Sequence, residues 1–264
     1  MRKVVLELSA FSVRYPNGNG VGPVDVSVDQ GGVLCVLGPS GGGKSTLITG
    51  ILGLAPAERC GRCLLDGALL DGPMLARTRG RRIGYLPQGP WSGWHPALSV
   101  GRQITDAASV YASGRAARLR ATALLRLAGC PDPDPILRAL PEELSGGLAQ
   151  RAALAVALAG DPMVLLADEP TSALDTITAR GLADTLVQLV SRGLSLVVAT
   201  HDVGLSLHLG GQALVLAGGS VVETGPVSSV LHTPCAKPTQ ELVEAWRKVH
   251  GVMAPNVGEW TVRP

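Results

Sequence analysis

The sequence lacks any apolar run long enough to cross a membrane. The best candidates, residues 152–160 and 194–200, fall far short of the roughly 20 apolar residues that a spanning helix needs. Near the N-terminus, Glu7 interrupts the apolar run that follows Arg2 and Lys3, which does not fit a secretory signal. We therefore expect a soluble, cytoplasmic chain, or one that is attached to a membrane only through partner proteins.

Cysteine and net charge are also scarce. Five cysteines in 264 residues are too few, and odd in number, for a disulfide framework, so we expect a reducing compartment. Cys60 and Cys63 have C-x-x-C spacing but no second pair at ligand spacing, which favours a structural role. The net charge of +2 is too small to indicate nucleic-acid binding, and we expect no such partner. An apolar content of 46% excludes a disordered chain.

Short apolar runs alternate with helical patterns. Val33–Leu37, Met163–Ala167 and Leu194–Ala199 are each bounded by turn or polar residues, which is typical of strands buried on both faces. Helical crossovers between such strands predict a parallel sheet and therefore the α/β fold class. Gln212–Leu216 and Ser220–Glu223 flank two glycines and predict a hairpin.

The middle of the chain is rich in Ala, Leu and Arg. Ser99–Ala112, Arg115–Ala128 and Leu148–Ala159 read as helices, and Pro131–Pro135 reads as a loop. Thr239–Val249 is a candidate helix in a tail richer in proline and polar residues. The pattern predicts three parts: an α/β core (residues 1–88 and 162–232), an inserted helical subdomain (89–161) and a C-terminal extension (233–264).

Residues 38–46 read GPSGGGKST, which fits the pattern G-x-x-x-x-G-K-[ST]. The segment follows a predicted buried strand and precedes a helical stretch. Glycines let successive backbone N–H groups turn toward phosphate oxygens, while the lysine reaches the outer phosphates and the Ser45 hydroxyl binds Mg²⁺. The residues expected to bind nucleotide here are Gly38, Pro39, Ser40, Gly41, Gly42, Gly43, Lys44, Ser45 and Thr46.

Two acidic residues close a later predicted strand. Asp168 and Glu169 directly follow the run Met163–Ala167, and ligands bind at the carboxyl ends of strands in open α/β sheets. With a phosphate loop upstream, we expect Asp168 to hold Mg²⁺ and Glu169 to act as the general base for the attacking water.

Further motifs resemble one family, the ATP-binding cassette (ABC) ATPases. Leu144–Arg151 reads LSGGLAQR, similar to the signature motif, and Asp168–Asp175 reads DEPTSALD, similar to the Walker B motif and D-loop. Gln88 matches the Q-loop, His201 the switch histidine and Tyr15 the aromatic residue that stacks on adenine. These elements occur in the order of the family and cover about residues 4–232. The resemblance implies a P-loop NTPase core with a mixed sheet and an inserted, mostly helical subdomain.

The resemblance also implies how the residues work. Two cassettes would hold two ATP molecules between them, with Ser145, Gly146, Gly147 and Asp175 of one subunit completing the site of the other. Glu169, His201 and Gln88 would be catalytic. The implied cofactors are ATP and Mg²⁺, and the implied metal ligands are Ser45, Gln88 and Asp168.

One branch is favoured within the family, the cassettes of oligopeptide, dipeptide and nickel uptake. Pro90, His95-Pro96 and Val100-Gly101 occupy places typical of that branch. The resemblance implies membrane permeases, a second cassette and an extracytoplasmic solute-binding protein as partners, at the cytoplasmic face of the cell membrane. We also hypothesise that Trp91 and Trp94 receive a permease helix.

Two departures are visible. Leu148 stands where the signature usually has Gln, and Thr233–Cys235 stands where the branch has His-Pro-Tyr. We expect catalysis to survive the first, because that Gln is not among the usual γ-phosphate contacts. The alternative function is a soluble cassette ATPase that is not coupled to transport, such as an iron–sulfur assembly ATPase.

Overall fold

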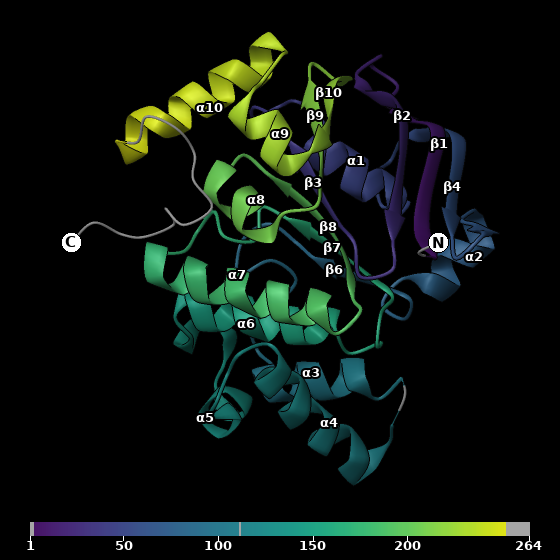
Figure 1. Cartoon of the computed structure of the whole chain (residues 1–264). Coiled ribbons are helices and arrows are strands. Elements are labelled where there is room, and N and C mark those ends of the chain that lie inside the picture. Colours follow the sequence, from purple (N-terminus) through teal and green to yellow (C-terminus); the bar gives the residue numbers. More distant parts are fainter. Residues whose placement is uncertain (1–2, 111, 252–264) are drawn as a thin grey trace.

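The computed structural model describes residues 3–110 and 112–251, which form two sheets with helices around them (Figure 1). The smaller sheet is antiparallel and has the strand order β2-β1-β4-β5. Its strands are β1 (Val4–Arg14), β2 (Gly20–Asp29), β4 (Glu58–Leu65) and β5 (Ala68–Leu69).

The larger, six-stranded sheet has the order β10-β9-β3-β8-β7-β6. All its strands run parallel except β10, which pairs antiparallel with β9. The strands are β3 (Val33–Leu37), β6 (Ile83–Leu86), β7 (Val164–Asp168), β8 (Ser195–Thr200), β9 (Gln212–Ala217) and β10 (Ser220–Pro226). The predicted parallel strands and the hairpin are therefore confirmed.

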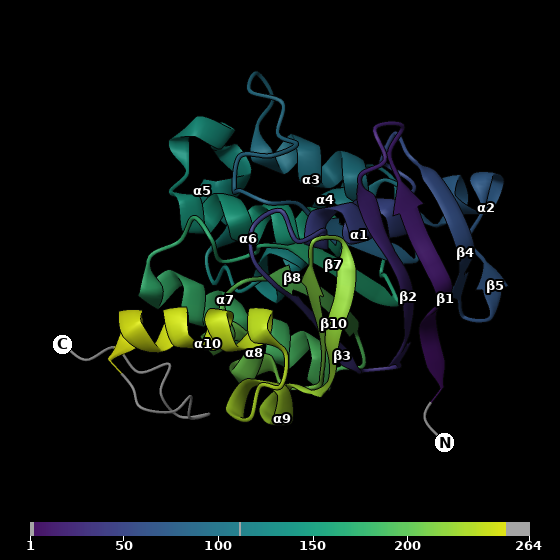
Figure 2. The same cartoon turned by 90° about the horizontal axis from the view of Figure 1, so that it is seen from above.

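The helices cover both sides of this sheet, and α3, α4 and α5 lie together at one end of the molecule (Figures 1 and 2). Within the described residues, every helix is too short or too polar to span a bilayer. The helices are α1 (Lys44–Ile51), α2 (Gly72–Thr78), α3 (Val100–Ala108), α4 (Gly114–Leu127), α5 (Pro133–Arg138), the 3₁₀ turn η1 (Pro141–Glu143), α6 (Gly146–Ala157), α7 (Thr176–Ser191), α8 (Val203–Leu209), α9 (Val227–His232) and α10 (Lys237–His250).

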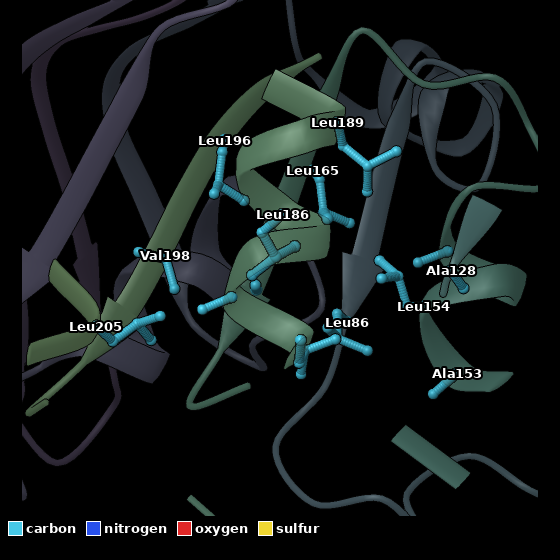
Figure 3. Packing of buried hydrophobic residues seen from close by; sticks show 14 of the residues in the cluster. Leu86, Ala128, Ala153, Leu154, Leu165, Leu186, Leu189, Leu196, Val198 and Leu205 are labelled. Carbon is cyan, nitrogen blue, oxygen red and sulfur yellow. The ribbon is translucent and has the colours of Figure 1, made fainter. Parts of the chain in front are cut away.

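The buried strands divide their side chains between two hydrophobic clusters. Because side chains alternate along a strand, Leu196 and Val198 of β8 face α6 and α7, whereas Val197 and Ala199 face α1 and the smaller sheet. Figure 3 shows the first cluster, in which Leu165 of β7 lies among leucines of α6 and α7. Both faces of the larger sheet are thus buried from solvent, which explains the continuous apolar runs in the sequence.

Two local predictions were wrong. Pro131–Pro135 was expected to be a loop, but α5 begins at Pro133, because a proline in the first helical turn loses no hydrogen bond and has a suitable φ. The helix expected over Ser99–Ala112 ends at Ala108. At that end the Ser109 hydroxyl donates to the Asp106 carbonyl (2.6 Å), which favours a turn over a further helical residue.

Candidate nucleotide-binding and hydrolysis site

Three neighbouring strands end at the same edge of the larger sheet. β3 pairs with β8 so that Leu37 lies opposite Thr200, and β7 pairs with β8 so that Asp168 lies opposite Ala199. The loops that follow these strands carry the predicted phosphate loop, Glu169 and His201, so the topology brings them together at the carboxyl edge, where ligands bind in open α/β sheets.

The phosphate loop has a backbone that requires glycine. Gly38 has φ +142°, and a Cβ there would overlap the Leu216 carbonyl oxygen. Gly43, with φ +105°, lies directly before α1. Gly41 has φ +76° and no atom within 4 Å of the place where a Cβ would lie, so the space above the loop is open. This loop and the N-terminus of α1 form a cradle that fits a phosphate group.

Lys44 lies folded across the loop. Its Nζ donates to the carbonyls of Gly38 (2.9 Å) and Pro39 (3.0 Å) and lies 3.7 Å from Glu169 Oε1. The side chain is only 6% exposed, and a charge so deeply buried needs charged or hydrogen-bonding partners. The ammonium group is therefore placed to bind the oxygens of a phosphate above the loop.

Ser45 and Asp168 meet beside the cradle, where the Ser45 hydroxyl donates to Asp168 Oδ1 (3.1 Å). Burial raises the pKa of Asp168; the Ser45 hydrogen bond and the Lys44 charge oppose this change, while the Glu169 charge adds to it. Hydroxyl and carboxylate oxygens are the ligands that Mg²⁺ prefers, and a bound cation would favour the ionised carboxylate. The donor set therefore fits Mg²⁺.

Glu169 is held from three directions. Its Oε1 lies 2.9 Å from His201 Nδ1, its Oε2 accepts from the Thr200 hydroxyl (3.3 Å), and its N–H donates to the Ala199 carbonyl (2.8 Å). Its backbone has φ +46°, a conformation that non-glycine residues adopt mainly where their surroundings impose it. The carboxylate is buried, whereas the His201 side chain is 56% exposed and open toward solvent.

A cleft of about 620 Å³ lies beside the phosphate loop and includes Tyr15. The turn Gly218–Gly219 of the β9–β10 hairpin also lines it, and Gly219 donates its N–H to the Gly42 carbonyl (3.2 Å). Sequence reasoning identified these two glycines as a hairpin turn but missed their place at the site. The paired glycines were a visible signal, but the sequence does not show that β9 lies next to β3.

Gln88 follows β6, and the pairing of Leu86 with Ala167 places it at the same sheet edge. Its side chain is exposed and forms no hydrogen bond with any other residue in the described part of the chain. The Gln88 carbonyl accepts from the Ser92 hydroxyl (2.6 Å). The structure thus brings Gln88 near the site without joining it to Asp168 or Glu169.

The signature segment and the D-loop are joined by Thr178. Ser145 caps α6, and its hydroxyl accepts from the Leu148 N–H (3.4 Å). Asp175 caps α7, accepts from the Thr178 N–H (3.0 Å) and hydroxyl (2.7 Å), and has its pKa lowered by these bonds. A Cβ at Gly147 would overlap Thr178 Cγ2. None of the predicted signature and D-loop residues lines the cleft formed by the described chain, so one chain alone does not bring them to the phosphate loop.

These features define a P-loop nucleoside triphosphatase: a parallel sheet, a glycine cradle with its lysine, and acidic residues at the end of a nearby strand. Residues 21–172 match the family model described as ABC transporter. The chain belongs to the ABC transporter family.

Curated relatives match most of the chain. It is 32% identical to the oligopeptide transport ATP-binding protein OppD of Bacillus subtilis (strain 168) over 244 residues, which cover 87% of this chain and 68% of that protein. It is 35% identical to the dipeptide transport ATP-binding protein DppD of Escherichia coli (strain K12) over 256 residues (91% and 78%). It is 34% identical to the nickel import ATP-binding protein NikD of Rhodospirillum rubrum over 236 residues (87% and 88%).

Solved structures agree. The dimeric post-hydrolysis state of the ATP-binding cassette MJ0796, bound to ADP and Pi, aligns with a TM-score of 0.75 at 29% identity and covers 84% of this chain and 98% of that one. The cbiO1 structure from Clostridium perfringens shares the fold, with a TM-score of 0.76 at 24% identity, covering 93% and 95%. The predicted family, fold class and ATPase activity are confirmed.

Proposed function

We propose that this cassette is the ATP-hydrolysing subunit of an importer for peptides, nickel or a related small solute. The names of the curated relatives, all transport or import ATP-binding proteins, support this function. They do not favour the alternative of a soluble cassette such as an iron–sulfur assembly ATPase. Within the chain, the observation that carries the proposal is the buried Lys44–Glu169 pair, with His201 beside Glu169, at the edge of the phosphate cradle.

This geometry supports the following residue roles. Lys44 and the backbone of residues 38–46 would hold the phosphates, and Tyr15 lies in the cleft where the nucleoside would extend. Ser45, Asp168 and Gln88 would together hold Mg²⁺, which neutralises phosphate charge when it is bound. The nucleotide-contacting residues in trans would be Ser145, Gly146, Gly147 and Asp175.

Glu169 is placed to take a proton from water. Its two oxygens are fixed by His201 and Thr200, so the carboxylate does not have to be ordered during the reaction. His201, open on its outer side, would contact the outermost phosphate of the same ATP. Replacing the Glu169 carboxylate with an amide would remove the proton acceptor and leave the phosphate cradle intact.

Two cassettes are needed to complete the site. The solved relative MJ0796 is dimeric, and the signature residues of this chain do not reach its own cleft. We infer that the signature segment of one subunit closes on the phosphate loop of the other, and that hydrolysis reopens the pair. The second cassette is either an identical or a different chain.

The permease contact would lie beside the Q-loop. A hollow of about 440 Å³ opens there between Tyr85, Trp94 and the α6 residues Ala153 and Val156. Trp94 is half-buried and donates its Nε1–H to the Pro90 carbonyl (3.0 Å), while Trp91 is exposed. A hollow with an aromatic wall fits an apolar helix end of a membrane permease.

The remaining parts of the proposal concern the assembly. The cassette would lie at the cytoplasmic face of the membrane, bound to permeases that receive solute from an extracytoplasmic solute-binding protein. The core (1–88 and 162–232), the helical subdomain (89–161) and the extension (233–264) would be its functional divisions.

The test is the exchange Glu169→Gln in the assembled transporter. ATP binding should persist because the cradle is unchanged, while kcat falls by about 10²–10⁴ from the loss of a general base. Glu142→Gln, an exposed carboxylate on η1, is the matched control and should leave kcat unchanged. An unchanged kcat in the Glu169→Gln protein would refute the assigned chemistry.

A further inference from the structure

A second hollow, of about 330 Å³, lies between the hydrolysis edge and helix α10. One wall is formed by residues of that edge, including Ser172 and His201. The other wall consists of apolar side chains of α10, among them Leu242, Ala245 and Val249. Glu169 and His201, which have roles in the proposal above, also line this hollow, but its α10 wall has no role there.

Helix α10 is firmly attached, so the wall has a fixed place. Val243 and Trp246 belong to the main hydrophobic cluster. The carboxylate of Glu223 on β10 accepts the N–H groups of Cys235 and Ala236 (3.0 Å each) just before the helix begins. The apolar face formed by Ala245 and Val249 nevertheless stays exposed.

An exposed aliphatic side chain lies close in sequence to the D-loop. Ile177, in the first turn of α7, is 79% exposed. It precedes Thr178, which contacts both Asp175 and the position of Gly147. Ile177 is therefore the direct neighbour of the residue that contacts both the D-loop and the signature segment.

We propose that, in the closed pair of two copies of this chain, Ile177 of each copy packs into the hollow beneath α10 of the other. The inference rests on the proposed closed dimer and takes its second cassette to be an identical chain. In that dimer the signature segment of one copy must reach the phosphate loop of the other, and it brings Ile177 with it. The hollow adjoins Glu169, which lies 3.7 Å from Lys44 of that phosphate loop.

Two-fold symmetry makes the contact reciprocal. In an isologous interface the same surface serves both copies, so a protruding residue and a hollow on that surface can each be filled by the other copy. Both contacts would bury apolar groups, Ile177 and Val249, that are exposed in the single chain. Helix α10 then stabilises the closed state only, and opening would expose the same surface again.

Disulfide trapping tests the contact directly. The parent chain carries Glu169→Gln to slow hydrolysis, with Cys60→Ser and Cys235→Ser, because the other three cysteines are buried. One variant adds Ile177→Cys and Ala245→Cys, and a reference variant adds Ser40→Cys and Ser145→Cys across the proposed nucleotide sandwich. Covalent dimers are measured after mild oxidation with Mg-ATP, with ADP and without nucleotide.

The proposal expects Mg-ATP-dependent covalent dimers from both variants. Dimers from the reference variant alone would overturn the α10 contact and leave the proposed function standing. No dimers from either variant would overturn the closed pair of identical copies together with the contact. An equal yield of covalent dimer from the Ile177/Ala245 variant with Mg-ATP, with ADP and without nucleotide would also overturn the proposal.

A second measurement uses milder changes in the Glu169→Gln chain. Ile177→Ala should raise the Kd of the ATP-bound dimer by about 30-fold, since two aliphatic contacts are lost per dimer. Leu119→Ala is the matched control, an exposed leucine on α4, and should leave Kd unchanged. Equal Kd values for both variants would refute the contact.

Discussion

A guanidinium group joins three helices in this cassette. Arg151 on the signature helix α6 donates through Nη1 to the Ala128 carbonyl at the end of α4 (3.0 Å) and to the Thr185 hydroxyl on α7 (3.1 Å). Its head lies where a Cβ at Gly129 would be, and its Nη2 is 2.7 Å from the corresponding point at Gly181. Two glycines thus leave space for one arginine.

The change Gly129→Ala should destabilise the protein by about 3–4 kcal/mol. Gly129 has φ +86°, and alanine in the left-handed region costs about 1–2 kcal/mol. The new methyl group also displaces Arg151 from its two hydrogen bonds. Because Arg151 is only half-buried and water can replace part of the loss, we take about 1 kcal/mol for each bond.

Chemical denaturation of a double-mutant cycle separates the two contributions. In an Arg151→Ala chain the cost of Gly129→Ala should fall to the backbone cost of about 1–2 kcal/mol, which gives a coupling energy of about 2 kcal/mol. Gly193→Ala is the matched control, with φ +99° and open space around the new methyl group, and should cost the backbone contribution alone. Equal costs of Gly129→Ala in both backgrounds would refute the role of Arg151.

Two further predictions concern the edges of the molecule. Replacing both Trp91 and Trp94 with alanine should release the cassette from its permease, measured by co-purification from membranes, and retained co-purification with normal transport would contradict the assigned surface. Burial alone would raise the pKa of Glu223, but the nearby Thr239 side chain and the backbone N–H groups of Cys235 and Ala236 lower it overall, so the ionised carboxylate stabilises the start of α10. Glu223→Gln should therefore speed amide hydrogen exchange in α10 at neutral pH, and the difference from the unchanged protein should disappear as the pH falls through the lowered pKa. A difference that persists in acid would show that ionisation of Glu223 is not the cause.

The parts of the site that the sequence predicts are those with local physical requirements. A strand buried on both faces must be continuously apolar, as Val33–Leu37 is, and a loop around a phosphate must use glycine where φ is positive, as at Gly43. Acidic residues that directly follow a buried strand are placed by the strand itself, as Asp168 and Glu169 are. These features need no knowledge of distant parts of the chain.

Other features depend on contacts between distant segments. β6 has four residues, and its place at the edge of the larger sheet comes from pairing with β7, a strand some 80 residues away. The start of α5 at Pro133 was missed because the same prolines fit a loop and a first helical turn equally well. The hollow under α10 depends on which face of that helix meets α8 and α9, and periodicity alone does not select the neighbour.

Contacts between α6 and α7 determine how hydrolysis would move other parts of the cassette. Thr178, at the start of α7, packs closely against Gly147 of the signature segment, and Arg151 joins the middle of α6 to the same helix through its hydrogen bond to Thr185. Because α6 contacts α7 at two separate points, a rotation of α6 relative to α7 would break at least one of these contacts. We therefore expect the two helices to move as one body. A signature segment that leaves the phosphate loop of a second cassette would then carry Asp175 and Ile177 with it. Loss of the γ-phosphate would thereby be coupled to loss of the apolar contact under α10.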